Sequence, residues 1–191
     1  MSYRVIAMPS SDRDSGTGCV LWLTGLSGAG KSTLSDRVSS ELRSRGHNVE
    51  VLDGDVVRES LSCDLGFSRE DREANVRRVA FVADLLSRHG VVVIVALVSP
   101  YRSGREAARE RIGDRFIEAY VRATVRACAE RDTKGLYAKA REGEIDNLTG
   151  VGDPYEEPPA PELVLDTEHE TPEESARKLL ECVDARVGAP V

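Results

Sequence analysis

Gly25-Leu26-Ser27-Gly28-Ala29-Gly30-Lys31-Ser32 is the stretch of sequence that decides the fold of this chain. Its spacing is G-x-x-x-x-G-K-S, with an apolar run at residues 20–23 before it and a helical pattern after it. A strand, a loop and a helix in this order form the setting in which such a motif binds phosphate. The glycines allow the backbone to adopt positive φ and to surround a phosphate chain with N–H groups. The stretch therefore predicts a phosphate-binding loop.

Two side chains of the loop separate this prediction from a plain turn. Lys31 is placed to reach the outer phosphates of a nucleotide, and the Ser32 hydroxyl can bind a magnesium ion. A glycine-rich turn that binds nothing has no need of a lysine and a serine at these positions. We therefore expect ATP or GTP as the phosphate donor, together with Mg²⁺, while the motif leaves the acceptor of the phosphoryl group open.

The length and the charge of the chain limit the remaining choices. A chain of 191 residues with 40% hydrophobic and 31% charged residues fits one globular domain with a core of its own. We expect residues 1–17 to form a flexible N-terminal segment and residues 18–191 to form that single domain. The formal net charge of −7 argues against broad binding to nucleic acid.

The cysteines and the apolar runs favour a cytoplasmic protein that binds no membrane. Cys19, Cys63, Cys128 and Cys182 lie far apart, without a C-x-x-C pair or a zinc spacing, as is typical of reduced thiols. Residues 1–17 are polar and rich in Gly, Ser and Asp after a short apolar patch, unlike a signal peptide or an anchor. The longest apolar run, residues 91–98, is too short to span a bilayer.

Strand and helix patterns alternate along most of the chain. We expect strands at residues 20–23, 48–52, 91–98, 116–121 and 163–165, and helices at residues 31–45, 68–89, 101–112, 124–132 and from about residue 172. This alternation predicts an α/β fold of the P-loop NTPase type, a doubly wound parallel sheet with helices on both faces. Residues 133–161 hold many Gly, Pro and charged residues, and we expect a mobile lid segment there, followed by a stiff Pro-rich connector.

Asp53-Gly54-Asp55 follows the second expected strand, at the sheet edge where α/β proteins bind ligands. Two carboxylates facing a phosphate loop can hold magnesium and accept a proton from an attacking hydroxyl. The alternative is an ordinary Asx turn between a strand and a helix. A dinucleotide dehydrogenase is rejected, because its fingerprint G-x-G-x-x-G has a different glycine order and gives no role to Lys31 and Ser32.

A group of arginines surrounds the start of the long helix expected at residues 68–89. Arg72 and Asn75 share a helical face, so the guanidinium can grip a phosphate or sulfate while the amide reads a hydroxyl. Phe67 lies in a loop, where stacking on a base and packing in the core are both open. For Arg69, Arg77 and Arg78 a solvated helix surface is the better interpretation.

The third strand is followed by Ser99-Pro100 and by no aspartate. Many phosphate-loop enzymes carry a magnesium-binding Asp at the end of such a strand, so here the pair Asp53 and Asp55 must take that role. Ser99 is expected near the phosphates, although a Ser before Pro is also a common residue at the start of a helix.

Taken together, these segments resemble adenylyl-sulfate kinase, which phosphorylates the 3′-hydroxyl of adenosine 5′-phosphosulfate (APS) with ATP. The resemblance covers residues 18–167 in order, and its more specific motifs lie beyond the phosphate-binding loop. The matching stretches are Gly25 to Ser32 with Thr33, Leu52-Asp53-Gly54-Asp55 with Val57-Arg58, Asp64-Leu65-Gly66-Phe67-Ser68, Glu70-Asp71-Arg72-Glu73-Ala74-Asn75, Ser99-Pro100-Tyr101-Arg102, Lys134-Gly135-Leu136-Tyr137, Gly143-Glu144-Ile145, Thr149-Gly150 and Asp153-Pro154-Tyr155-Glu156.

The resemblance implies a role for each matching position. ATP would be bound by Gly25, Leu26, Ser27, Gly28, Ala29, Gly30, Lys31, Ser32, Thr33 and Arg131. APS would be bound by Asp55, Arg58, Phe67 (stacked on adenine), Arg72, Asn75, Val98, Ser99, Lys134, Leu148 and Thr149. We expect Lys31, Asp53, Asp55 and Ser99 to be catalytic, with Asp55 as the base and Ser32 and Asp53 (through water) on Mg²⁺, although the two aspartates could exchange roles.

Three further points follow from the resemblance. Bacterial members are described with a phosphoserine at the position of Ser99, but in-line transfer needs only positioning and charge neutralisation. The family has Phe where this chain has Leu148, and Asp-Thr-Pro where it has Arg122-Ala123-Thr124, which leaves open a related kinase acting on another nucleotide or nucleoside. A homodimer, an ATP sulfurylase partner, and a non-catalytic regulatory module of the same fold are the remaining expectations.

Overall fold

A computed structural model describes residues 18–187 and confirms the predicted α/β architecture. Five parallel strands form one sheet in the order β2-β3-β1-β4-β5. Their bounds are Val20–Thr24 (β1), Val49–Asp53 (β2), Val92–Ala96 (β3), Phe116–Arg122 (β4) and Leu163–Asp166 (β5). Every expected strand is present, with shifts at its ends.

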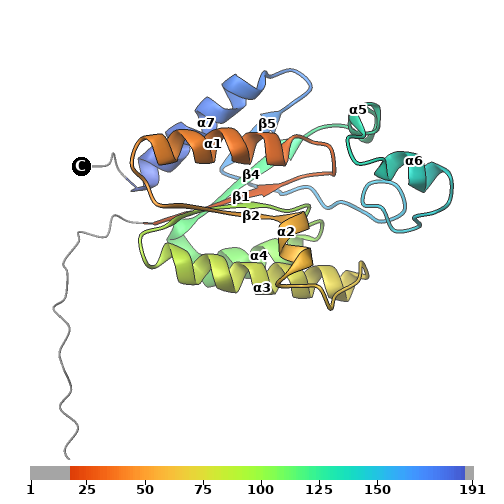
Figure 1. Cartoon of the computed structure of the whole chain (residues 1–191), viewed down its shortest axis with the longest axis horizontal. Coiled ribbons are helices and arrows are strands. Elements are labelled where there is room, and N and C mark those ends of the chain that lie inside the picture. The colour runs from red at the N-terminus through yellow and green to blue at the C-terminus, as the bar shows by residue number, and fades with distance from the viewer. Residues whose placement is uncertain (1–17, 188–191) are drawn as a thin grey trace, which may run out of the picture.

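Helices cover both faces of the sheet (Figure 1). Helices α1 (Lys31–Ser44) and α7 (Pro172–Val187) lie on one face, and α3 (Arg69–Ser87) and α4 (Arg102–Ile112) lie on the other. The strands β1 and β3 are buried throughout, because both of their faces are covered, and their sequences are correspondingly apolar. The core therefore forms two clusters, one around Leu21 and Ile94 and one around Trp22 and Val95.

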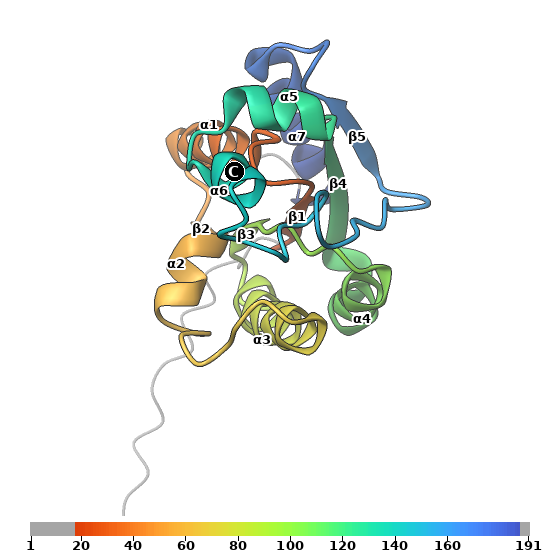
Figure 2. The ribbon, with the colours of Figure 1, turned by 90° about the vertical axis from the view of Figure 1, so that its right-hand side faces the viewer.

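The phosphate-binding loop connects β1 to α1 at the carboxyl edge of the sheet. Helices α5 (Val125–Arg131) and α6 (Leu136–Arg141) lie beyond this same edge, as the turned view in Figure 2 shows. Parallel strands bring all of their carboxyl ends to one side, so the loops that follow β1, β2 and β3 meet there. This arrangement gathers the predicted functional residues.

Two short helices differ from the expectation from sequence. Helix α2 (Gly54–Glu59) follows β2 directly, where no helix was expected, and Asp53 caps it by accepting a hydrogen bond from the N–H of Asp55, the contact of the Asx turn that the sequence left open. Helix α6 lies inside the lid segment (residues 133–161), where no periodic pattern was expected. Within residues 18–187 there is no helix that combines the length and the apolar character needed to cross a membrane.

Candidate active site

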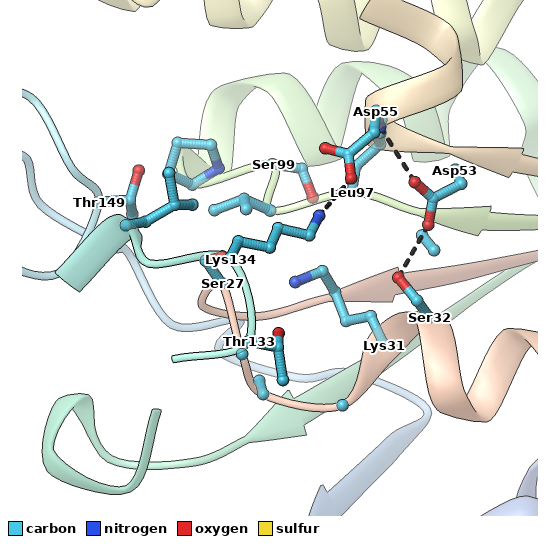
Figure 3. Close-up of a pocket in the computed structure, with 18 of the residues that line it drawn as sticks. Ser27, Lys31, Ser32, Asp53, Asp55, Leu97, Ser99, Thr133, Lys134 and Thr149 are labelled. Carbon is cyan, nitrogen blue, oxygen red and sulfur yellow. Dashed lines mark hydrogen bonds and ion pairs between the residues drawn. The ribbon is translucent and has the colours of Figure 1, made fainter. Parts of the chain in front are cut away.

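A cavity of about 990 Å³ opens at the carboxyl edge of the sheet (Figure 3). This volume is at the upper end of the range for small-molecule sites. The phosphate-binding loop, α2, the start of α3, the loop after β3 and the lid segment all contribute to its lining. Of the residues predicted for the site, it is lined by Ser27, Gly28, Ala29, Gly30, Lys31, Ser32, Thr33, Asp53, Asp55, Arg58, Phe67, Arg72, Asn75, Val98, Ser99, Arg131, Lys134, Leu148 and Thr149.

The glycines of the phosphate-binding loop have the backbone conformation that the motif requires. Gly25, Gly28 and Gly30 all have positive φ, at 150°, 77° and 105°. A Cβ on Gly25 would lie 2.3 Å from the carbonyl oxygen of Val121, so this position also excludes any side chain by contact. The loop is therefore fixed both by its own dihedral angles and by β4 behind it.

Lys31 is buried at the base of the loop. Its ammonium group donates hydrogen bonds to the carbonyl oxygens of Gly25 at 3.0 Å and of Leu26 at 2.8 Å. These two residues do not line the cavity, and instead hold the lysine that does. Burial lowers the pKa of Lys31 to about 8. The group is thus a poorly solvated cation that gains much from an anionic ligand.

Ser32 and Asp53 form the oxygen pair that was predicted for magnesium. The Ser32 hydroxyl donates to Asp53 Oδ2 at 2.9 Å, and Asp53 Oδ1 accepts from the N–H of Asp55 at 3.0 Å. Within residues 18–187 no cluster of three or more His, Cys, Asp and Glu side chains could hold a metal alone. A hydroxyl and one carboxylate suit Mg²⁺, which keeps several waters and takes further oxygens from phosphate. The donor set fits the ion.

Asp55 faces the lid segment. Lys134 forms an ion pair with it across the cavity, and Figure 3 shows Lys31 and Lys134 pointing toward the same space. Both partners are largely exposed, so this pair contributes little to stability. Its importance is geometric, because it places the lid lysine beside the carboxylate that was predicted to be the base.

Phe67 lies in the wall of the cavity and not in the core. Its ring is half-exposed, and the guanidinium carbons of Arg58 and Arg72 lie 4.3 Å and 5.4 Å from the ring centroid. Burial lowers the pKa of both arginines from the ordinary value. An exposed aromatic face beside two arginines is suited to a planar, anionic ligand. The alternative of core packing is thereby excluded.

Two buried polar groups in the cavity have no partner within residues 18–187. They are Asn75 Oδ1 on α3 and Thr149 Oγ1 in the lid segment. A buried polar atom without a hydrogen bond costs free energy, so an unpaired group in a cavity wall indicates a ligand that completes it. Asn75 and Thr149 are therefore placed to read a polar ligand between them.

The lid segment is joined to α3 next to this wall. Arg72 donates to the carbonyl oxygen of Asn147 at 2.8 Å and lies 3.6 Å from the Asp153 carboxylate. Leu148, between these contacts, is buried and packs in the same cluster as Leu26. Arg72, which lines the cavity, thus also holds the lid segment in place.

Ser99 lies in the loop after β3 (residues 97–101) with a φ of 39°, in the left-handed region that a serine rarely adopts. Its hydroxyl is buried, accepts a hydrogen bond from Trp22 Nε1 at 3.1 Å and donates to Thr24 Oγ1 at 3.0 Å. These bonds use the hydroxyl proton inside the protein. A catalytic role of Ser99 stays a prediction, and the geometry favours a structural one.

The donor side of the cavity includes Thr167, a residue that sequence reasoning missed, beside the predicted Arg131. Arg131 donates to the carbonyl oxygen of Gly28 at 3.3 Å and to that of Thr167 at 2.7 Å, while the Thr167 hydroxyl donates to the carbonyl oxygen of Ala29 at 2.9 Å. Thr167 follows β5, and its place at the end of a strand was the available signal. Thr167 thus connects the phosphate-binding loop to the end of the edge strand β5.

Two arginines of α3 lie on the surface, as the sequence predicted, and one buried network was not predicted. Arg69 stacks on Tyr101 and Arg78 pairs with Asp64, and neither lines the cavity, in agreement with a surface role. Sequence reasoning also missed a buried network behind the Ser99 loop that includes Thr24 and Arg105. A polar residue ending an apolar strand was the signal for Thr24, whereas Arg105 has none, since α4 holds several arginines.

Comparison with known proteins gives a consistent result. The family model described as Adenylylsulphate kinase matches residues 17–166. The adenylyl-sulfate kinase of Halothermothrix orenii is 52% identical over 169 residues, which cover 88% of this chain and 91% of the relative. The structure of the Mycobacterium tuberculosis APS kinase in complex with AMPPNP and APS has a TM-score of 0.85 and 40% identity, covering 88% of this chain and 99% of that one. A hexameric APS kinase from Thiobacillus denitrificans has a TM-score of 0.66 and 32% identity, covering 90% of this chain and 29% of that one.

Proposed function

We propose a reaction for this chain, which belongs to the adenylylsulphate kinase family. It transfers the γ-phosphoryl group of ATP to the 3′-hydroxyl of APS and releases ADP and 3′-phosphoadenosine 5′-phosphosulfate. The observation that carries the proposal is a single cavity that joins the phosphate-binding loop to a wall of Arg58, Phe67, Arg72 and Asn75. A donor site for a triphosphate and an acceptor site for an anionic nucleotide thus share one space.

The donor half of the mechanism rests on Lys31 and on the loop. The N–H groups of the loop and the buried ammonium bind the β- and γ-phosphates, and in the complex the ammonium exchanges its loop carbonyls for phosphate oxygens. Ser32, and Asp53 through water, would hold Mg²⁺, which when bound neutralises charge on the phosphates. Arg131 covers the loop from the donor side.

The acceptor half rests on the opposite wall. We assign Arg58 and Arg72 to the phosphosulfate, because paired guanidinium groups suit such anions, and Phe67 to the adenine ring. Asn75, Thr149 and the backbone at Val98 then read the nucleoside. Asp55 accepts the proton of the 3′-hydroxyl as that oxygen attacks phosphorus, and Lys134 neutralises charge beside it.

The reaction is tested by measuring whether ADP formation depends on added APS. Purified protein with MgATP should form ADP in an amount equal to the added APS, with a panel of other nucleotides and nucleosides as controls. ADP formation that does not depend on APS at micromolar concentrations would contradict the proposal. The same panel would reveal a related kinase with another acceptor, which the named relatives do not favour.

The roles of Asp53 and Asp55 can be distinguished by the Mg²⁺ concentration that variants at each position require. We predict that Asp55→Asn lowers kcat by about 10²–10⁴-fold, the range for loss of a general base, without changing the Mg²⁺ concentration needed for half-maximal rate. Asp53→Asn should instead raise that Mg²⁺ requirement, because Asp53 is the carboxylate bonded to Ser32. Initial rates across a Mg²⁺ titration measure both. The reverse pattern would exchange the two roles.

Three expectations about cellular context complete the proposal. We place the enzyme in the cytoplasm as a homodimer, with assembly supported in general by the hexameric relative. Light scattering after size-exclusion chromatography measures the assembly. A complex with ATP sulfurylase, whose product is APS, is tested by co-purification of the two proteins.

A further inference from the structure

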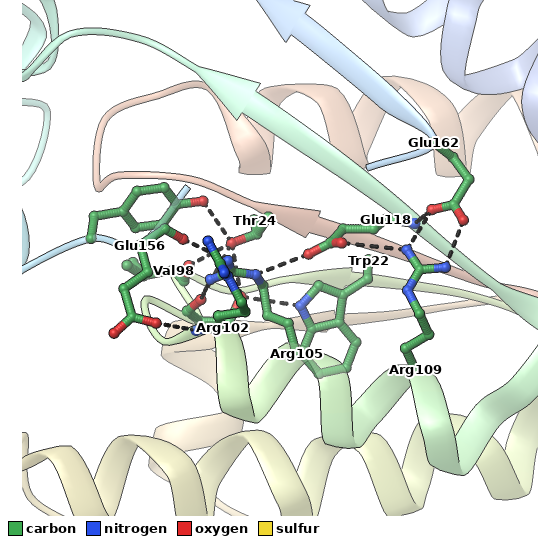
Figure 4. Close-up of polar contacts among 11 residues, drawn as sticks. Trp22, Thr24, Val98, Arg102, Arg105, Arg109, Glu118, Glu156 and Glu162 are labelled. Carbon is green, nitrogen blue, oxygen red and sulfur yellow. Dashed lines mark hydrogen bonds and ion pairs between the residues drawn. The ribbon is translucent and has the colours of Figure 1, made fainter. Parts of the chain in front are cut away.

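Arg105 is a buried cation that none of the proposed roles uses. It lies on α4, only 2% exposed, and its guanidinium donates in three directions (Figure 4). Nε donates to Glu118 Oε1 at 2.9 Å, Nη1 to the carbonyl oxygen of Ser99 at 2.7 Å, and Nη2 to the carbonyl oxygen of Glu156 at 2.5 Å. A charge at such depth is costly unless it is paired and fully hydrogen-bonded, and here it is both.

Glu118 supplies the charge balance and the orientation. It projects from β4, is buried, and its other oxygen accepts from Arg109 at 3.3 Å, which in turn pairs with Glu162. With Nε fixed on this carboxylate, the planar guanidinium has its remaining donors directed at two backbone carbonyls. The ion pair therefore sets where those carbonyls lie.

The first carbonyl belongs to the Ser99 loop, which lines the acceptor side of the cavity. Ser99 holds its left-handed conformation through Trp22 and Thr24, and Thr24 Oγ1 also donates to the carbonyl oxygen of Val98 at 2.8 Å. A serine with positive φ is strained, so the surrounding bonds must hold it in place.

The second carbonyl belongs to Asp153-Pro154-Tyr155-Glu156, a motif of the sequence that received no role above. The hydroxyl of Tyr155 lies 2.9 Å from Thr24 Oγ1, and the N–H of Glu156 donates to the carbonyl oxygen of Pro100 at 2.8 Å. This stretch follows Leu148 and Thr149 in the lid segment. It is the point at which the lid returns to the body of the protein.

We propose that Arg105 is a positioning residue for the acceptor, acting by fixing the Ser99 loop and the lid return at one distance from each other. Arg105 joins two segments that line the acceptor side: the Ser99 loop, with Val98 and Ser99, and the lid segment, with Leu148 and Thr149. The rest of the acceptor wall lies elsewhere, with Arg58 on α2 and Phe67 in the loop before α3. Loss of Arg105 therefore widens the APS site and leaves the phosphate-binding loop unchanged. The inference rests on the proposed function for the identity of the acceptor.

The test is the double variant Arg105→Met/Glu118→Met. Exchange of a buried ion pair for apolar side chains of similar size is often neutral for stability, so the variant should fold, whereas a lone charge would be left by either single change. We expect KM for APS to rise about ten-fold or more, the order for loss of a hydrogen bond from a charged donor, with KM for ATP within about two-fold of wild type. The thermal midpoint should fall by only a few degrees, because two carbonyl oxygens lose a donor while no buried charge is left unpaired.

Arg109→Met is the matched control. It removes the other guanidinium from the same carboxylate but touches neither Ser99 nor Glu156, and it should leave both KM values unchanged. A folded double variant with wild-type KM for APS, or with KM for APS and ATP raised alike, overturns the inference. APS-dependent ADP formation by the wild type tests the function separately, so the two failures are distinguishable.

Discussion

At the residue scale, the Lys31 ammonium group connects the protonation of the protein to nucleotide binding. The Lys31 ammonium donates to the carbonyl oxygens of Gly25 and Leu26, and its pKa of about 8 is well below the ordinary 10.5 because of burial. A bound triphosphate places anionic oxygens beside it and raises that pKa again. Nucleotide binding and protonation of Lys31 are therefore linked.

This linkage predicts a pH dependence of ATP binding. Below pH 8 Lys31 is already protonated in the free protein, so its contribution to Kd is constant. Above pH 8 the free protein has lost the proton and must take it up on binding, so Kd should rise by up to about ten-fold per pH unit. Calorimetry with an ATP analogue from pH 7 to 9.5 measures the slope, and Lys31→Arg, which does not titrate there, should flatten it. A wild-type slope equal to that of the variant would contradict the linkage.

A second residue bears on the acceptor. Leu148 lines the cavity in the position where the resemblance to the family leads us to expect Phe, and Phe67 lines the same cavity. We predict that Leu148→Phe lowers KM for APS by about five-fold, since aromatic stacking contributes about 1 kcal/mol beyond burial. Leu148→Met, similar in volume, is the control and should leave KM near wild type. An increase in KM for the Phe variant would mean that the buried site is overpacked.

Residues of the site were predictable where a motif spaces them along the chain. Two short segments hold most of these residues: Asp53 and Asp55 at the end of a strand, and Arg72 and Asn75 on one helical face. We could expect them to converge because ligands bind at the carboxyl edge of a parallel sheet. Arg105 could not be found in this way. Its carbonyl partner in the lid return is 51 residues away, and the contact forms because the lid return lies against the start of α4, where the N–H of Arg102 also donates to Glu156.

At the element scale, the long periodic segments were predictable, and so were the short helix α5 and the short strand β5, whereas helices α2 and α6 were not. The buried strand β3 and the 19-residue helix α3 carry unmistakable patterns. Helices α2 and α6 have six residues each, too few for a repeat of 3.6 residues to become visible, and each has a glycine at its start. Local carboxylate contacts at their first turns stabilise them: Asp53 accepts from the N–H of Asp55 in α2, and Asp132 accepts from the N–H groups of Tyr137 and Ala138 in α6.

The cap of α3 gives an element-scale prediction. Ser68 Oγ accepts a hydrogen bond from the N–H of Asp71 at 3.1 Å, as its place in the sequence predicted. Ser68→Ala should lower the free energy of unfolding by about 1 kcal/mol, whereas Ser68→Asp should retain the cap and nearly full stability. Urea denaturation measures both. Because α3 carries Arg72 and Asn75, KM for APS should rise in the Ala variant and not in the Asp variant.

At the scale of the whole molecule, the two halves of the site come from opposite layers. The loop leading into α1, with Arg131 and Thr167, supplies the donor side, and α3 with the Ser99 loop supplies the acceptor side. The lid segment is the part of the chain that contacts both: the Tyr137 hydroxyl donates to the carbonyl oxygen of Ser27 in the phosphate-binding loop at 2.9 Å, and Leu148 and Thr149 lie at the acceptor wall.

This division predicts that the two ligands stabilise the protein jointly. Whichever nucleotide binds first orders part of the lid segment, so the second binds to a segment whose conformational entropy is already reduced. With MgADP and APS together, the rise in Tm should exceed the sum of the separate rises, and amide exchange in residues 133–152 should slow most. Tyr137→Phe removes the hydrogen bond between the lid and the phosphate-binding loop and should make the shifts additive. Additive shifts in the wild type would mean that the lid serves one ligand alone.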